Sequence, residues 1–259
     1  TDLPTVLALT VVMLAVMHWL QKADRSLLPP LIAGGTAGIL LLLRTQSMLI
    51  FPAVILLALL LYFPRWKEWA VASAIFFLGI LLVASPWLIR NAKLTGKITF
   101  DDPAQLALLS SQYGTSNILD TQSFDFENES LSSSILDFAL SNPAYVARFI
   151  SSHFFATEIS ALLALPLIFP FNGFQEPVNI YWMDWNGSLS LPNQLLMLLY
   201  LVVIAFGIGA SWKRLRWIGL VPLFFSLVYA LSNGVARFSG WRYSLPAAWV
   251  GYFYFALGF

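Results

Sequence analysis

The sequence predicts an all-α protein, a polytopic transmembrane helix bundle with an extracytoplasmic loop region and an interfacial helix. Of its 259 residues, 59% are hydrophobic and only 10% are charged, and the mean hydropathy is +0.76. A soluble domain carries about 25% charged residues. Apolar segments close to the roughly 20 residues that cross a bilayer also recur along the chain. With so few charges, this apolar surface cannot all be buried in one water-facing globule.

The composition also excludes several classes of function. The formal net charge of +1 gives no electrostatic footprint for nucleic acid, so no nucleic-acid partner is expected. The chain has no cysteine, which excludes disulfides, thiolate nucleophiles and thiolate metal sites. No P-loop, nucleophile elbow or HExxH motif is present. We therefore expect partners that are membrane lipids or substrates held at a membrane.

Four spans are predicted within residues 1–90. They cover Leu3–Leu20, Leu27–Leu43, Met48–Phe63 and Trp69–Ile89. Asp2 and Pro4 suit the N-cap and the first turn of the first helix. Gly34 and Gly38 form a small-xxx-small pair, which allows a neighbouring helix to approach the second span closely.

Residues 91–193 are predicted to form extracytoplasmic loops, because acids, Ser, Thr and Asn are concentrated there. Short helices are expected at Pro103–Ser111 and Leu131–Leu140. Pro143–Phe155 has apolar residues at helical spacing between polar ones, which predicts a helix lying in the membrane interface. Ile159–Phe171 is apolar but too short to span and is broken by prolines, which favours a re-entrant segment.

Residues 194–259 are predicted to contain three further spans, Gln194–Ala210, Trp217–Leu231 and the helix that starts at Leu245. Short basic turns follow the first, third and fifth spans. Their basic residues are Lys22 and Arg25, Arg65 and Lys67, and Lys213, Arg214 and Arg216. They alternate with the spans so that all three turns fall on one side, which the positive-inside rule makes cytoplasmic.

Charged residues at the opposite ends of the helices are the main candidates for a functional site. Arg44, Arg90 and Arg242 fall there together with Asp2. An Arg at the centre of a membrane helix costs roughly 2.5–3.5 kcal/mol on insertion scales, so a guanidinium near that depth benefits from an anionic partner. A lipid-linked phosphate fits, because Arg binds phosphate bidentately. The alternative is that each Arg reaches the lipid headgroups as a simple anchor.

Five residues are weaker candidates: Asn91, His153, Glu158, Arg237 and Tyr243. Asn91 adds an amide that both donates and accepts hydrogen bonds beside Arg90. His153 is either a packed residue of the interfacial helix or a metal ligand or proton-transfer group. Glu158 precedes the short apolar segment, where it is either a cap-region carboxylate or a functional one. Arg237 and Tyr243 belong to a loop rich in Arg and aromatic residues.

Three short motifs occur in a recognisable order. They are Leu42-Leu43-Arg44-Thr45-Gln46-Ser47, Ser85-Pro86-Trp87-Leu88-Ile89-Arg90-Asn91 and Arg242-Tyr243-x-x-Pro246. Together with the acid-x-Pro start at Asp2, they resemble the GT-C class of polytopic glycosyltransferases, in particular the bacterial family related to protein O-mannosyltransferases and the lipid A aminoarabinose transferase. That family usually has Leu-Thr-Arg-Pro in the first motif, so Arg44 lies one place early and Gln46 stands where proline is usual. The second motif usually reads Pro-Trp-x-x-Arg-Asn and is matched.

The resemblance implies a transferase that moves a sugar from a polyprenyl-phosphate donor to a lipid, glycan or protein acceptor. The protein would lie in the bacterial inner membrane with its active face extracytoplasmic. Arg44, Arg90 and Arg242 would bind the donor phosphate. Asp2 would match an acidic position at which some members bind a divalent cation, so a divalent metal is the one cofactor that the resemblance allows. The family's main catalytic carboxylate lies ahead of Thr1, so we expect an N-terminally incomplete chain.

Two other functions stay open. A transporter or flippase for a lipid-linked or amphipathic solute would show inverted repeats with paired broken helices, and the sequence shows no such symmetry. A noncatalytic membrane assembly subunit would need no cluster of Arg and Asp at one end of its helices.

Overall fold

The computed structural model describes residues 2–21, 26–96, 98, 100, 131–163, 190–238 and 241–259, and within these ranges it contains helices and no strands. The α-helices are α1 (Asp2–Gln21), α2 (Leu28–Leu43), α3 (Ile50–Tyr62), α4 (Trp66–Thr95), α6 (Leu131–Ser141), α7 (Pro143–Leu163), α8 (Leu191–Leu215), α9 (Val221–Val235) and α10 (Trp241–Gly258). Two 3₁₀ turns, η1 (Thr45–Leu49) and η3 (Arg216–Leu220), precede α3 and α9. The predicted all-α class is confirmed.

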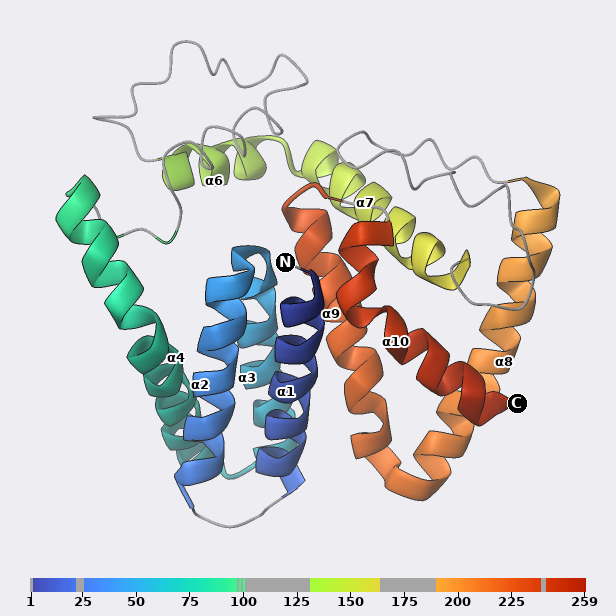
Figure 1. Cartoon of the computed structure of the whole chain (residues 1–259), viewed down its shortest axis with the longest axis horizontal. Helices are drawn as coiled ribbons and strands as arrows, with labels where there is room; N and C mark the ends of the chain where they lie inside the picture. Colours follow the sequence, from blue (N-terminus) through green and yellow to red (C-terminus); the bar gives the residue numbers. More distant parts are fainter. Residues whose placement is uncertain are drawn as a thin grey trace.

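Within the described residues, four helical stretches are long and apolar enough to cross a membrane. They are Leu3–Gln21, Thr45–Tyr62, Trp66–Leu94 and Leu191–Val235, and α2 is a shorter apolar helix. The last stretch contains α8, η3 and α9, which run down and back up as a hairpin (Figure 1). The membrane character of the chain is therefore confirmed, while the predicted total of seven spans stays a prediction.

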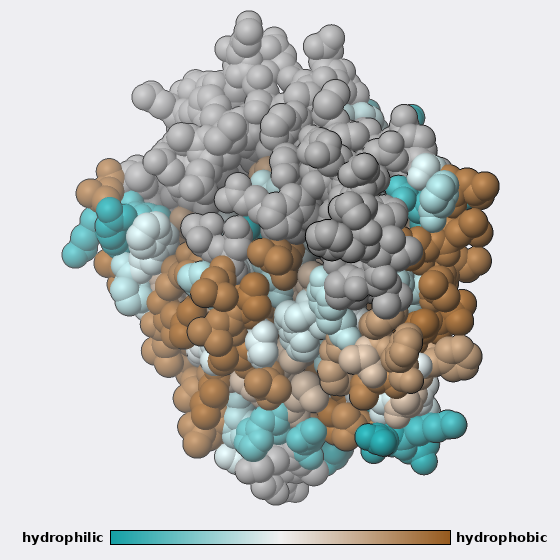
Figure 2. All heavy atoms as spheres, turned by 45° about the vertical axis from the view of Figure 1, so that its right-hand side comes forward, coloured by the Kyte–Doolittle hydropathy of each residue, from teal (hydrophilic) through white to brown (hydrophobic). Residues whose placement is uncertain are grey.

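The helices form two groups joined side by side. Helices α1 to α4 make one group and α8 to α10 the other, while α6 and α7 lie across one end of them (Figure 1). The turns that join α3 to α4 and α8 to α9 lie at the opposite end. Figure 2 shows apolar side chains over the middle of the visible face and hydrophilic ones along its lower edge, as expected of a bilayer-facing belt above basic turns.

Several helices extend past their predicted bounds: α8 covers Leu191–Leu215 rather than Gln194–Ala210, α10 starts at Trp241 rather than Leu245, and α4 and α7 also continue further. Helix α4 continues from Ile89 through Arg90 and Asn91 to Thr95, because these residues are compatible with a helix. It stops at Gly96, whose φ of 71° is left-handed and favours glycine. Helix α7 runs from Pro143 to Leu163 without a break, so it includes the start of the predicted re-entrant segment.

The interpretation of Glu158 as a cap-region residue is therefore wrong, because Glu158 lies inside α7. No proline or glycine lies between Phe155 and Leu163 to end the helix there. The short helix expected at 131–140 is confirmed by α6. The helix expected at 103–111 and the later part of the predicted re-entrant segment lie outside the described residues.

Glycines allow the closest helix contacts in each group. A Cβ atom added to Gly34 of α2 would lie 1.9 Å from the backbone oxygen of Phe76 on α4. A Cβ atom on Gly207 of α8 would lie 1.8 Å from the backbone oxygen of Tyr254 on α10. Any other residue would push these backbones apart, as expected of membrane helices that associate through small residues.

Candidate functional site

Arg44 joins the two helix groups. It lies between α2 and η1 in an extended conformation, with φ −149° and ψ 100°, because the polar stretch that begins there interrupts the apolar helix. Its Nη1 donates a hydrogen bond of 3.2 Å to the hydroxyl of Tyr229 on α9, a residue 185 positions away. Its guanidinium lies 5.5 Å from the centre of the Tyr243 ring on α10. The predicted candidates Arg44 and Tyr243 are therefore in contact.

Arg237 lies just after α9 and is only 6% exposed. Its φ of 57° is in the left-handed region, which is strained for a residue with a long side chain. Its guanidinium lies 5.9 Å from the ring centre of Tyr145 and 5.3 Å from that of Phe149, both on α7. A desolvated cation–π contact is worth about 2 kcal/mol, which offsets part of the cost of burying this cation.

Tyr243 and Asn233 connect the surroundings of the two arginines. The side-chain amide of Asn233 donates to the backbone oxygen of Tyr243 at 3.1 Å. The backbone N–H of Phe238 donates to the backbone oxygen of Asn233 at 2.9 Å. The rings of Phe238 and Tyr243 stack with centres 4.9 Å apart and planes 12° apart.

These contacts define what we call the arginine–aromatic cluster. Its members are Arg44, Tyr145, Phe149, Tyr229, Asn233, Arg237, Phe238 and Tyr243. Its members come from the junction of α2 and η1, from α7, from α9 and the residues just after it, and from α10, and it lies at the end of the molecule that α7 covers (Figure 1).

Three buried polar oxygens in and beside this cluster have no hydrogen-bond partner among the described residues. They are Oε1 of Gln46, Oη of Tyr145 and Oδ1 of Asn233. Gln46 is held in place through its backbone oxygen, which accepts a hydrogen bond from the hydroxyl of Ser232 beside Asn233. A buried polar group without a partner costs about 1–3 kcal/mol. Each of these oxygens can accept a hydrogen bond from a bound hydroxyl group.

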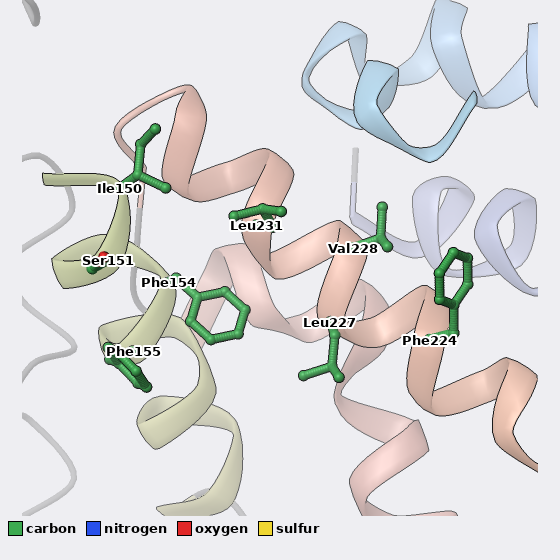
Figure 3. A pocket seen from close by; sticks show the side chains of 8 residues that line it. All are labelled: Ile150, Ser151, Phe154, Phe155, Phe224, Leu227, Val228 and Leu231. Atoms are coloured by element: carbon green, nitrogen blue, oxygen red, sulfur yellow. The ribbon is translucent and has the colours of Figure 1, made fainter. Parts of the chain in front are cut away.

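An apolar groove between α7 and α9 adjoins the cluster. It has a volume of about 350 Å³ and is lined by Ile150, Ser151, Phe154, Phe155, Phe224, Leu227, Val228 and Leu231. Figure 3 shows Phe154 and Leu231 facing each other across the gap between the two helices. Ile150 of the groove packs against the same apolar residues as Tyr145, among them Phe149. A Cβ atom built on Gly234, next to Asn233, would lie 2.8 Å from the backbone oxygen of Ile150. The groove therefore adjoins the cluster at Ile150.

Arg90 and Asn91 lie elsewhere. The guanidinium of exposed Arg90 lies 5.0 Å from the ring centre of Trp87, and the side-chain amide of Asn91 donates to the backbone oxygen of Phe100 at 3.4 Å. The C-terminal end of α4 diverges from α9 and α10 (Figure 1). The structure thus brings Arg44, Arg237 and Tyr243 together and places Arg90 and Asn91 apart from them.

The remaining candidates have different surroundings. Arg242 lies in the first turn of α10 next to Tyr243, and Asp2 starts α1, a helix that contacts α10, but both side chains lie outside the described residues. His153 is 1% exposed and lies one helical turn after Phe149 on α7. Burial raises the pKa of Glu158, also on α7, from 4.5 to about 7. In the described part of the chain, no three His, Cys, Asp or Glu residues are grouped to hold a metal ion.

Sequence reasoning missed Tyr145, Phe149, Tyr229, Asn233 and Phe238. The aromatic residues lie in segments rich in other aromatics, so nothing in their spacing distinguishes them. Asn233 offered a usable signal, because an amide inside an apolar helix is costly unless it has a specific partner.

No protein-family model, curated protein or solved structure matches this chain.

Proposed function

We propose that the chain is the donor-binding part of a membrane glycosyltransferase that takes a sugar from a polyprenyl-phosphate donor on the extracytoplasmic side. The observation that carries the proposal is that the apolar groove adjoins the arginine–aromatic cluster at Ile150. A polyprenyl phosphate has the same two parts, an anionic head and a long apolar tail. The order of sequence motifs supports the same reading.

The guanidinium groups of Arg44 and Arg237 would bind the donor phosphate. Arg44 is oriented by Tyr229, and Arg237 by the rings of Tyr145 and Phe149. In the transfer, the acceptor oxygen forms a bond to the anomeric carbon while the bond from that carbon to the phosphate oxygen breaks. The electron pair goes to the phosphate oxygen, and a base takes the proton of the acceptor hydroxyl. Fixed guanidinium groups stabilise the charge that develops on the phosphate. We assign the base to none of the described residues.

The groove would hold the first isoprene units of the tail. Its lining is apolar apart from Ser151, and it opens between α7 and α9. Binding of a hydrocarbon is stabilised by roughly 25 cal/mol for each Å² of its apolar surface that leaves water. A tail buried in the groove would therefore strengthen binding of the whole donor, including its phosphate end.

The oxygens of Asn233, Gln46 and Tyr145 that lack partners would accept hydrogen bonds from the sugar hydroxyls. The stacked pair Phe238 and Tyr243 offers an aromatic surface beside them. The cluster therefore has groups for both the phosphate and the sugar of the donor.

The test is transfer of radiolabelled sugar from undecaprenyl- or decaprenyl-phosphate donors into a membrane fraction that contains the acceptor. Arg44→Ala and Arg237→Ala should each lose about 100-fold or more, the typical cost of removing one group that stabilises developing charge. The matched control is Arg148→Ala, because Arg148 is an exposed arginine of α7 outside the cluster. Wild-type transfer in both cluster variants would refute the proposal.

Binding measurements with undecaprenyl phosphate separate the enzyme from the alternative of a lipid transporter or flippase. If the protein is the transferase, it should bind undecaprenyl phosphate and also transfer the sugar. Binding without transfer, combined with movement of the labelled lipid between leaflets of a vesicle, would favour the transporter.

A further inference from the structure

A second pocket lies at the end of the molecule that holds the turn between α3 and α4. It has a volume of about 270 Å³ and is lined by Ser26, Leu27, Tyr62, Lys67, Glu68, Val71 and Ala72. These residues come from the segment just before α2, the end of α3 and the start of α4. The pocket shares no residue with the arginine–aromatic cluster or with the apolar groove.

The surroundings place this pocket where a membrane meets water. Two of the apolar stretches long enough to span, Thr45–Tyr62 and Trp66–Leu94, end and begin beside it. In the turn between them, Phe63 is 74% exposed and Trp66 is 61% exposed. Aromatic side chains in such turns insert at the level of the lipid headgroups.

Among the described charged residues around the pocket, one cation has no ion-pair partner. Nη1 of Arg65 lies 3.5 Å from Oε2 of Glu68, so the acid on the pocket wall has its own counter-ion. Lys67 makes no ion pair with a described residue, and its ammonium lies 5.8 Å from the ring centre of Trp66. Two cations and one acid give this turn a charge of +1, which matches one phosphodiester.

The lining contains both polar and apolar groups, as a phospholipid does. Nε1 of Trp19 donates to the hydroxyl oxygen of Tyr62 at 3.1 Å, which fixes that hydroxyl and leaves its hydrogen to donate elsewhere. Ser26 adds a second hydroxyl beside Lys67. Leu27, Val71 and Ala72 supply the apolar wall.

We propose that this pocket binds an anionic glycerophospholipid from the leaflet that faces the basic turns. Lys67 and the hydroxyls of Tyr62 and Ser26 bind the phosphodiester, and the first carbons of an acyl chain lie against Leu27 and Val71. A small soluble anion would leave the apolar wall unused. A zwitterionic headgroup would leave the charge of the turn unmatched.

The experiment measures the unfolding temperature of the purified full chain in neutral detergent with added phosphatidylglycerol or phosphatidylcholine. Measurements at 0.5 M NaCl, where the screening length is only ~4 Å, suppress attraction to the general surface. Phosphatidylglycerol should raise the unfolding temperature by about 3 °C or more, as expected of a ligand that binds the folded state. Phosphatidylcholine and inorganic phosphate should not.

Lys67→Ala should lose at least half of this shift. The matched control is Lys213→Ala, because Lys213 is an exposed lysine of the other basic turn at the same end and lies outside the pocket. Val71→Trp fills the pocket without changing its charge and should also lose the shift, which covers the case in which Lys67→Ala does not fold. The proposal is overturned if Lys67→Ala and Val71→Trp keep the full shift. It is equally overturned if Lys213→Ala loses as much as Lys67→Ala, or if phosphatidylcholine gives the same shift.

Discussion

Arg237 follows α9, Arg90 lies in the last turns of α4, and each guanidinium lies near an aromatic ring, yet their surroundings differ. Arg237 is buried beneath Tyr145 and Phe149, which α7 brings across the end of α9. Arg90 is exposed on α4, and within the described residues its guanidinium lies near the ring of Trp87 on the same helix. The difference is that a second helix covers one arginine and not the other. A cationic helix end therefore becomes a candidate binding site only where another element encloses it.

The largest effect expected from this difference is on sugar transfer. Arg237→Ala should lower transfer from a polyprenyl-phosphate donor by about 100-fold or more, because it removes a fixed cation from a desolvated site. Arg90→Ala should lower it less than about 5-fold, because an exposed guanidinium is screened by water and salt. Comparing kcat/KM of the two variants checks this. A loss in Arg90→Ala as large as that in Arg237→Ala would show that the donor phosphate also reaches the end of α4.

A second test uses Glu158, a partly buried carboxylate on α7. The unfolded state of Glu158 releases its proton near pH 4.5, whereas the folded state keeps it up to about pH 7. Stability should therefore fall as the pH rises from 4.5 to 7, by up to about 3 kcal/mol. Glu158→Gln should remove this loss, which unfolding temperatures between pH 4 and 8 would measure.

Asp137→Asn is the control for Glu158→Gln, because Asp137 is an exposed carboxylate of α6. It should keep the pH dependence of the wild type. If Glu158→Gln also keeps the pH dependence of the wild type, the folded protein does not shield Glu158 from water as strongly as the structure indicates.

A third test concerns the hydroxyl of Tyr145, which is buried in the cluster without a partner. Tyr145→Phe keeps the ring over Arg237 and should stabilise the free protein by about 1–2 kcal/mol, because a buried unsatisfied group is removed. The same change should weaken binding of a sugar-bearing donor about 5-fold, the typical worth of one hydrogen bond, and leave binding of undecaprenyl phosphate unchanged. Equal weakening of both ligands would mean that this hydroxyl contacts the phosphate.

The smallest effect is expected at the open end of α4. Gly96 ends the helix with a φ of 71°, and a Cβ atom built there meets nothing within 4 Å. Gly96→Ala should therefore cost only the conformational penalty, about 1 kcal/mol, which an unfolding curve would detect. Sugar transfer should stay at the wild-type level. A loss of transfer in this variant would show that the end of α4 has a role in the reaction that its exposure does not suggest.

The helical class was predictable because composition and apolar segment length act locally. The break at Arg44 was also predictable, since a polar stretch follows an apolar helix there. The length of α7 was not, because the sequence pattern changes at Glu158 while the backbone continues. The cluster was the least predictable part, since its contacts join Arg44 to residues of α9 and α10 that are far away in the sequence.

The hydrogen bond from Arg44 to Tyr229 also has a consequence for how the two helix groups separate under mechanical force. It ties the group α1 to α4 to the group α8 to α10, and the contact of Gln46 with Ser232 lies beside it. A molecule that binds Arg44 and Arg237 at once would fasten the two groups together. Mechanical pulling on the two halves should then show one rupture event with that molecule bound and two without it.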